Sequence, residues 1–433
     1  MVGCGSSGHS FTQQPISVSI ATAPSAIGTG ANWTYTATVS GTSNQTVTWS
    51  SSGGAIDSSS GLFIAPNTVP SPAGITITAT SAADSSATAS ATVTVQANDP
   101  LGTATGSSFT CPTFAGGLPA DESTCYQVNI SCDGIADFSA YVKVNQPSGT
   151  PVGTVILGTG TGGSALYDYD NPDFFNGSTN GGLAVVNGLL SAGFTTAQVT
   201  FGAPFNTNAT NGWLQGPGGV RRLACRYATL AQWIYTNIPN SKSIPLCATG
   251  NSGGAGAIGY ALTEYGLDSV FAMVETTSGP PMSRLDEACV QQNPCQNETT
   301  YSCNGTNETI HMCYATSESE IIDPAYSTPI CTNAVNGTSA PPAGLLLSDS
   351  ILGGPTPNFP STYVNLVIGG EDTSSAPDQA LTWEQAITSI DEANQGCVSD
   401  APHALPSVED GVTRIVTDIT NHCVLPAERV SQK

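Results

Sequence analysis

The chain has 433 residues, of which 39% are hydrophobic and only 9% are charged, and this length predicts two or three domains. Nine Lys and Arg against 32 Asp and Glu give a net charge of −23. Such a surface repels phosphate backbones and anionic headgroups, which argues against nucleic-acid binding and electrostatic membrane docking. No run of about 18 apolar residues occurs, so we predict no membrane-spanning helix.

Residues 1–13 are expected to form a flexible tail. Their opening, Met-Val-Gly-Cys-Gly-Ser-Ser-Gly, resembles the mature start of a bacterial lipoprotein, in which the cysteine becomes lipidated. The hydrophobic signal segment that would precede it is absent and is expected to have been trimmed. Two interpretations of Cys4 remain, a site of lipid attachment and an incidental thiol in the tail. We expect a secreted protein or a lipoprotein anchored at the bacterial cell surface or outer membrane.

The sequence contains 13 cysteines and only four histidines. No cysteine belongs to a Cys-x-x-Cys pair, and histidine is too scarce for the ligand spacing of a zinc knuckle. The cysteines therefore indicate disulfides in an exported protein, and we predict no metal site. Without Cys4, twelve thiols remain, enough for six bridges.

From residue 14 to residue 97, hydrophobic and polar residues alternate in short runs that are separated by Gly, Ser and Asn turns. This pattern is typical of a β-sandwich with one buried face. The segment resembles the bacterial Ig-like repeats of surface proteins through its residues 47–50, 60–63 and 75–80. We interpret it as a spacer, with glycan binding as the alternative. The expected strands are 16–20, 33–39, 47–49, 75–80 and 89–95.

Residues 98–108 are predicted to be a linker. From residue 109 to residue 433, strands alternate with helices, which indicates a mostly parallel sheet with helices on both faces. Ser407 is the expected N-cap of the last helix, with acidic Glu409 and Asp410 in its first turn. The expected strands are 152–157, 197–201, 244–249, 270–274 and 363–368, and the expected helices are 182–190, 221–238, 253–265 and 408–421.

A long insertion at residues 278–345 separates the last two of these strands. It carries five cysteines. Long loops inside a compact domain are uncommon unless they are functional. We therefore predict a disulfide-stapled cap over a cleft, and a surface excursion without function is the alternative.

Residues 250–254 read Gly-Asn-Ser-Gly-Gly, a G-x-S-x-G sequence between a predicted strand and a predicted small-residue helix. That context predicts a sharp strand-to-helix turn which presents Ser252 to a cleft as a nucleophile. Small neighbours are needed because Gly250 and Gly254 must let the helix pack close to the strands. The alternative is an ordinary Gly/Ser turn.

A serine hydroxyl needs a base that is oriented by a carboxylate, in the chain order serine, acid, histidine. Asp372 closely follows the strand at 363–368, with Glu371 and Asp378 as rivals. His403 precedes the last helix and is the expected base. The other histidines fit less well: His422 follows that helix as a cap, His311 lies in the insertion and His9 lies in the tail.

Tetrahedral intermediates need two hydrogen-bond donors to their oxyanion. The amide of Gly253 is the first candidate. The second should come from the glycine-rich loop at 157–163, in which Thr159 and Gly160 are the candidates. No lysine follows this loop, so we reject a phosphate-binding loop.

Together these sites resemble the α/β-hydrolase superfamily over about residues 109–430. Membership implies that Ser252 forms an acyl-enzyme, that His403 shuttles the proton and that Asp372 orients His403. It also implies that water hydrolyses the acyl-enzyme and that no cofactor takes part. Two departures are the missing His-Gly-Gly-Gly oxyanion sequence and a poorly marked final strand at 394–399. From its position, a bridge between Cys397 and Cys423 would tie down the histidine loop.

Exported hydrolases that this chain resembles are commonly esterases acting on acyl esters, on feruloyl or acetyl groups of plant walls, or on polyesters. We therefore predict a monomeric serine esterase acting on a small or polymeric ester. A serine peptidase of the same fold and a non-catalytic surface adhesin are the alternatives. Six aromatic residues are candidates for a substrate platform, although most are expected in the core or at the rim: Tyr167, Tyr169, Phe174, Trp213, Trp233 and Trp383.

Overall fold

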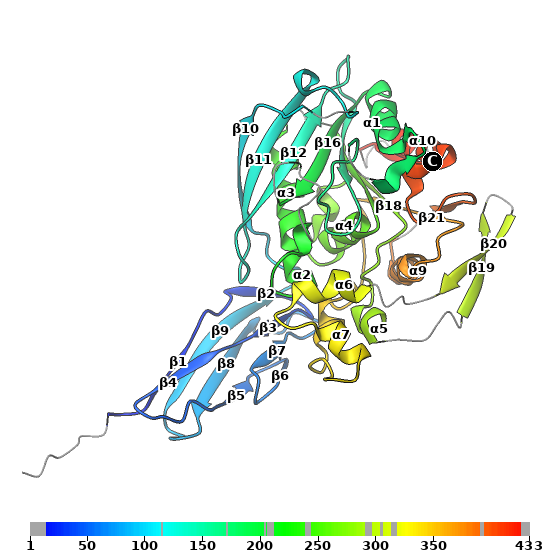
Figure 1. The fold of residues 1–433 in the computed structure, drawn as a ribbon. Helices are drawn as coiled ribbons and strands as arrows, with labels where there is room; N and C mark the ends of the chain where they lie inside the picture. Colours follow the sequence, from blue (N-terminus) through cyan, green and yellow to red (C-terminus); the bar gives the residue numbers. More distant parts are fainter. Residues whose placement is uncertain are drawn as a thin grey trace, which may run out of the picture. The chain divides into compact units, whose positions relative to one another are not determined.

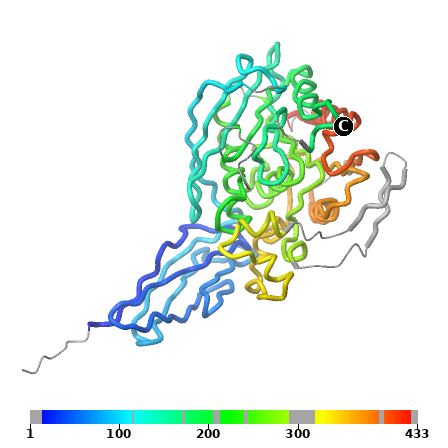
Figure 2. Tube along the Cα trace, viewed as in Figure 1, coloured from blue at the N-terminus to red at the C-terminus, as the bar shows by residue number. Residues whose placement is uncertain are grey.

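The chain divides into two compact units, Met1–Gln96 and Ala97–Lys433, which Figure 1 shows as a ribbon and Figure 2 as a tube. Cys4 and the predicted tail lie outside the described residues. This computed structural model describes residues 14–113, 116–169, 172–202, 205, 212–238, 244–290, 297–303, 306–312, 318–389 and 394–425.

The described part of the first unit consists of strands around an aromatic core. Trp33, Tyr35, Trp49 and Phe63 are buried there, and β8 alternates buried with more exposed positions, as expected for a sheet with one buried face. A four-stranded sheet has the order β2-β9-β8-β5, a three-stranded sheet has the order β3-β7-β6, and β1 pairs with β4. The bounds are β1 Ser17–Ile20, β2 Ala26–Gly28, β3 Asn32–Thr34, β4 Ala37–Ser40, β5 Val47–Ser51, β6 Ala55–Ile56, β7 Leu62–Ile64, β8 Gly74–Ser81 and β9 Thr88–Gln96.

The single strand expected at 33–39 is wrong, because the chain changes sheet in the middle of it. β3 pairs with β7, whereas β4 pairs with β1. At the break, the Tyr35 amide donates to the Gly61 carbonyl at 2.9 Å, and the Tyr35 ring is buried. Alternation of side chains continues through the break, so the sequence pattern could not reveal the change of partner.

A nine-stranded sheet forms the centre of the second unit, in the order β10-β11-β12-β16-β13-β17-β18-β21-β22. The pairs from β10 to β16 are antiparallel, and those from β16 to β22 are parallel. The expected strands are confirmed, the one at 270–274 with a shift to 273–277. The bounds are β10 Thr103–Phe109, β11 Ser123–Ser131, β12 Phe138–Asn145, β13 Gly153–Gly158, β16 Phe194–Phe201, β17 Leu246–Asn251, β18 Met273–Thr277, β21 Tyr363–Gly369 and β22 Asn394–Val398.

Helices cover both faces of this sheet (Figure 1). Val155 and Leu157 of β13 pack with α1 and α10, whereas Ile156 between them packs with α3 and α4. The Asn180 side chain caps α1 by accepting from the Leu183 amide at 3.0 Å. The mostly parallel sheet with helices on both faces is therefore as expected. The bounds are α1 Gly181–Ser191, α2 Val220–Leu223, α3 Cys225–Asn237, α4 Gly253–Thr263, α9 Ala376–Ala386 and α10 Glu409–His422.

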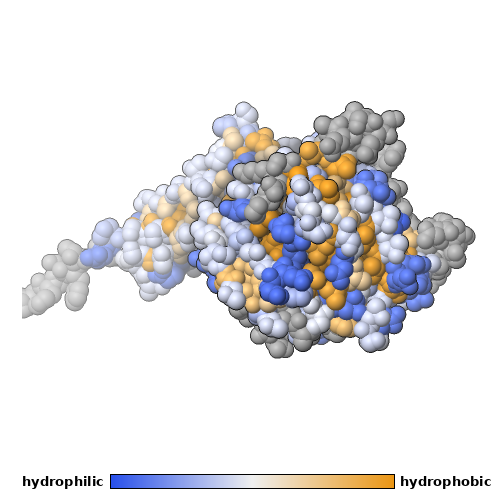
Figure 3. All heavy atoms as spheres, turned by 90° about the horizontal axis from the view of Figure 1, so that it is seen from above, coloured by the Kyte–Doolittle hydropathy of each residue, from blue (hydrophilic) through white to orange (hydrophobic). Residues whose placement is uncertain are grey.

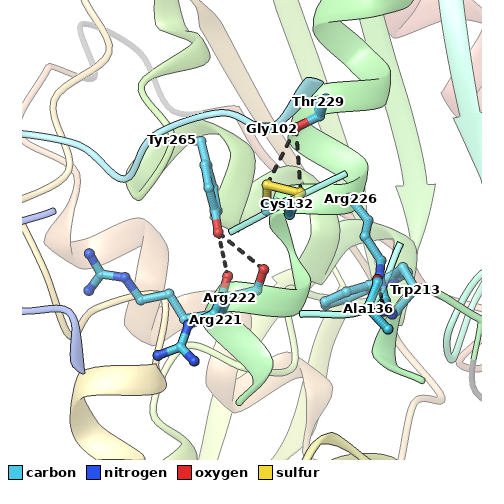
Figure 4. Close-up of a disulfide and its surroundings, with 10 residues drawn as sticks. Gly102, Cys132, Ala136, Trp213, Arg221, Arg222, Arg226, Thr229 and Tyr265 are labelled. Atoms are coloured by element: carbon cyan, nitrogen blue, oxygen red, sulfur yellow. Dashed lines mark hydrogen bonds between the residues drawn. A yellow bond between two sulfur atoms is a disulfide. The ribbon is translucent and has the colours of Figure 1, made fainter. Parts of the chain in front are cut away.

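Two smaller expectations need correction. Residues 98–108 are not a free linker, because β10 begins at Thr103 and the Asp99 carboxylate pairs at 2.6 Å with buried Arg221. Figure 4 shows the neighbourhood of Arg221, in which the Tyr265 hydroxyl donates to the Arg221 carbonyl. Ser407 is not the N-cap of α10: it ends a 3-10 turn, and Val408 takes the cap position without a side-chain hydrogen bond.

Four disulfides join described cysteines: Cys111–Cys125, Cys132–Cys225, Cys247–Cys423 and Cys289–Cys331. Figure 4 shows the second of these beside Thr229 of α3. The expected Cys397–Cys423 bridge is wrong. Cys397 faces α9 from β22, whereas Cys423 follows α10 on the opposite face of the sheet, where Cys247 also points. Cys397 is itself disulfide-bonded. The face of the sheet on which each cysteine lies separates Cys397 from Cys423 and brings Cys247 to Cys423.

The insertion at 278–345 contains short helices and a hairpin, and the Cys289–Cys331 bridge joins its helices α5 and α7. Among the described residues, no helix combines the length and hydropathy needed to cross a bilayer. Figure 3 shows one face of the molecule, where hydrophobic residues lie at the surface between hydrophilic ones. The remaining bounds are β14 Phe175–Asn176, β15 Thr179–Asn180, α5 Leu285–Val290, β19 Asn297–Cys303, β20 Thr306–Met312, α6 Glu318–Ile322, α7 Ile330–Val335 and α8 Leu345–Asp349.

Candidate active site

The predicted site residues gather at the carboxyl ends of the parallel strands. The chain leaves β13 for β16 on one side and returns to β17 on the other side of β13. In an open α/β sheet, ligands bind at such a switch point, outside the carboxyl ends of the strands. Ser252 follows β17, Asp372 follows β21 and His403 follows β22. The final strand expected before the histidine is therefore present.

Ser252 occupies a sharp turn between β17 and α4. Its φ of 52° and ψ of −115° are a backbone conformation that residues other than glycine rarely adopt. Such a strained backbone persists only where the surrounding structure enforces it. The Ser252 amide donates to the Thr277 carbonyl at 2.9 Å, which holds the turn against β18. A Cβ on Gly250 would lie 2.6 Å from the carbonyl carbon of Gly254. The expected need for small residues beside the serine is confirmed.

His403 and Asp372 are joined by a hydrogen bond of 2.8 Å between Nδ1 and Oδ2. The Asp372 side chain is fully buried, whereas 39% of the His403 side chain is exposed. Burial alone would raise the pKa of Asp372, but the hydrogen bonds from His403 and Ser374 outweigh it, and the net effect lowers the pKa below its usual value. An ionised carboxylate only accepts, so Nδ1 of His403 carries the proton and Nε2 can act as a base.

Ser374 contacts both Asp372 and His403, and the sequence did not lead us to expect it in the site. Its amide donates to Asp372 Oδ1 at 2.9 Å, and its hydroxyl lies 3.1 Å from His403 Nδ1. An aspartate that accepts from the backbone two residues later is a common turn arrangement, so the spacing Asp372-x-Ser374 was a usable signal. Ser374 holds both members of the His403–Asp372 pair.

Ser252 and His403 line the same two cavities. The apolar cavity has a volume of about 240 Å³ and is otherwise lined mainly by Pro281, Met282, Ile321, Ile322 and Ala376. The polar cavity has a volume of about 370 Å³ and is otherwise lined by Gly160, Thr161, Asp173, Phe174, Asn251, Pro402 and Ala404. The insertion therefore supplies four residues of the apolar cavity.

The candidate oxyanion donors lie on either side of Ser252. Gly253 is the first residue of α4, and the amides in the first turn of a helix have no acceptor within it. A Cβ on Gly160 would lie 3.5 Å from the Ser252 Cβ, so this loop passes beside the serine. Thr159 is buried, with its hydroxyl donating to the Ala165 carbonyl at 3.1 Å. Thr161, which was not singled out, lines the polar cavity with a φ of 51°.

The rival site residues have other surroundings. Glu371 is exposed, Asp378 lies in α9, and the His422 ring stacks on Tyr363 at 4.3 Å between centroids. His9 and the side chain of His311 lie outside the described residues. Of the six aromatic candidates, Phe174 alone lines a cavity described here; Tyr167, Trp213, Trp233 and Trp383 are buried in the core.

No protein-family model and no curated protein matches the chain. Est1E from Butyrivibrio proteoclasticus is 10% identical, with 68% of this chain and 96% of that chain covered and a TM-score of 0.38. A carboxyl esterase from Bacillus coagulans is 13% identical (69% and 99% covered, TM-score 0.40). Acetyl xylan esterase 1 from Thermoanaerobacterium sp. JW/SL YS485 is 12% identical (73% and 87% covered, TM-score 0.42).

Proposed function

We propose that the second unit is a serine hydrolase that cleaves carboxylic esters, with Ser252 as nucleophile, His403 as general base and Asp372 as the acid that orients it. The observation that supports this most is the 2.8 Å hydrogen bond between His403 Nδ1 and the buried carboxylate of Asp372. The strained turn at Ser252 adds to it, because that serine opens into both cavities that His403 lines.

In this mechanism the Ser252 hydroxyl attacks the ester carbonyl while His403 Nε2 takes its proton. The imidazolium that forms is stabilised by Asp372. The Gly253 amide and an amide of the loop at 159–161 donate to the oxyanion. His403 then returns the proton to the alcohol oxygen as the C–O bond breaks. In the second half, His403 takes a proton from water as the water oxygen attacks the acyl carbon, and it returns this proton to Ser252 Oγ as the bond between Oγ and the acyl group breaks.

The test compares esters with amides of the same acyl group. Wild type should hydrolyse p-nitrophenyl butyrate, Ser252→Ala should lose at least about a thousandfold in kcat, and Ser107→Ala in the exposed part of β10 should change nothing. Faster turnover of p-nitroanilides than of esters would instead favour a serine peptidase. No turnover on either class, together with no labelling by a fluorophosphonate, would favour a non-catalytic adhesin.

We also propose that the first unit is an Ig-like spacer in an exported protein. The all-strand architecture and the four disulfides support this, because disulfides persist in oxidising compartments. Lipidation of Cys4 is the proposed mode of anchoring. Intact-mass analysis of protein isolated from a bacterial membrane fraction tests it, since a diacylglyceryl group adds a defined mass to the N-terminal peptide.

A further inference from the structure

The two cavities that meet at Ser252 and His403 differ in chemistry. Met282 and Ile322 of the apolar cavity are 2% exposed, and Ile321 beside them is half-buried. The polar cavity is instead lined by Asp173, Thr161 and Asn251, whose side chains carry a carboxylate, a hydroxyl and an amide. An ester also has two unlike halves, so the question is which half enters which cavity.

The proton path assigns the halves. His403 has to protonate the leaving oxygen, so the alcohol lies against the loop that carries this histidine. Pro402 and Ala404 on either side of His403 line the polar cavity alone. The oxyanion donors lie on both sides, since Gly253 lines the apolar cavity and Gly160 and Thr161 line the polar one, so the position of the histidine loop decides the assignment. The alcohol therefore belongs in the polar cavity and the acyl chain in the apolar one.

Size and charge then define each half. At about 240 Å³, the apolar cavity is smaller than the roughly 300–1,000 Å³ of pockets for drug-sized ligands, which suits a chain of a few carbons. In the polar cavity, Asn251 Oδ1 accepts from the Thr277 hydroxyl at 3.1 Å, which fixes the amide so that its Nδ2 can donate to a ligand. The Asp173 carboxylate accepts from hydroxyl groups and repels anions.

We propose, on the basis of the ester hydrolysis inferred above, that the preferred substrates join a short acyl chain to an alcohol that carries further hydroxyl groups and no negative charge. Ile321 limits the length of the acyl chain, and Asp173 selects against anionic alcohols. The net charge of −23 acts in the same direction by lowering the concentration of anions near the site.

The acyl half is tested with p-nitrophenyl acetate, butyrate, hexanoate and decanoate. In wild type, kcat/KM should peak at butyrate or hexanoate. Ile321→Trp should lower the hexanoate-to-acetate ratio about tenfold or more, and Ile321→Ala should move the optimum to longer chains. A wild-type optimum at decanoate, or equal effects of both variants on all four esters, would overturn the assignment. Thermal melting of each variant checks that it folds.

The alcohol half is tested with two butyrate esters, monobutyryl glycerol and the butyryl ester of lactate, followed by titration of the released acid. Wild type should prefer the glycerol ester. Asp173→Asn should raise the relative kcat/KM on the lactate ester about three- to tenfold at low salt, whereas Asp121→Asn, which removes the same charge at an exposed position in the turn before β11, should not.

An unchanged ratio in Asp173→Asn, with both esters still hydrolysed, overturns this inference and leaves the ester hydrolase intact. If wild type hydrolyses neither butyrate ester nor any p-nitrophenyl ester, the proposed function itself fails. The two failures are therefore distinguishable.

Discussion

The Ser374 hydroxyl lies 3.1 Å from Nδ1 of His403. The same nitrogen is 2.8 Å from Asp372 Oδ2, so the imidazole is held from two directions. The Ser374 hydroxyl is itself fixed, because it accepts from the Ala376 amide at 3.2 Å at the start of α9. The orientation of the ring thus depends on the junction between β21 and α9 as well as on the carboxylate.

Removing this hydroxyl should lower kcat and leave KM nearly unchanged. Ser374→Ala deletes a contact of about 1 kcal/mol, so we expect a loss in kcat of about three- to tenfold on p-nitrophenyl butyrate, with partial recovery in Ser374→Thr. A change in KM alone, or a Ser374→Thr variant as poor as Ser374→Ala, would show that Ser374 does not position His403.

Neutralising the carboxylate should be far more severe. Asp372→Asn presents an amide that can donate toward Nδ1, which disfavours the tautomer with Nε2 free as a base, and we expect a loss in kcat of about a hundred- to ten-thousandfold. Asp121→Asn is the matched control. Activity within tenfold of wild type would exclude Asp372 as the orienting acid and would return attention to Asp378.

The same carboxylate should contribute to stability in a pH-dependent way. Its pKa is lowered in the folded protein from the ordinary value of 3.8, because the hydrogen bonds from His403 and Ser374 outweigh burial. A lowered pKa stabilises the fold above the unfolded-state value, and this contribution is lost as the pH falls through the folded-state value. In urea unfolding, the free energy of unfolding of wild type should therefore exceed that of Asp372→Asn at pH 6. This difference in free energy should shrink below about pH 3.8.

The turn after Ser252 should not tolerate even a methyl group. A Cβ on Gly253 would lie 1.7 Å from the Thr161 carbonyl oxygen, whereas one on Gly256 in the same helix would find its nearest neighbour at 3.6 Å. We expect Gly253→Ala to abolish ester hydrolysis and to lower the melting temperature. Gly256→Ala should retain activity and gain up to about 1 kcal/mol from helix propensity. Equal behaviour of the two variants would contradict the close approach.

The Cys247–Cys423 disulfide should contribute more to stability than Cys111–Cys125. The bridged residues are 176 positions apart in the first pair and 14 in the second, and the chain-entropy estimate gives about 5 and about 3 kcal/mol. Urea unfolding of the two double Cys→Ala variants measures both values. A larger loss for the shorter loop would mean that strain or residual structure, rather than loop entropy, sets the difference.

Local signals in the sequence were sufficient for the alternation of strands and helices and for the turn at Ser252. Hydrophobic periodicity and glycine placement act over a few residues, so they can be read without knowing what lies opposite. The chain order of serine, acid and histidine likewise predicts Ser252, Asp372 and His403 as site residues, and the structure places the last two within hydrogen-bonding distance.

Partner choice was decided by the tertiary structure alone. The sheet change at Tyr35, the pairing of Cys247 with Cys423 and the contact of Ser374 with His403 each join residues whose meeting depends on strand parity and on which helix covers which face. The linings of the two cavities also depend on the tertiary structure, since Ile321 comes from the insertion and Asp173 comes from a turn before α1. A one-dimensional pattern carries the face on which a side chain lies, but not the residue that it meets there.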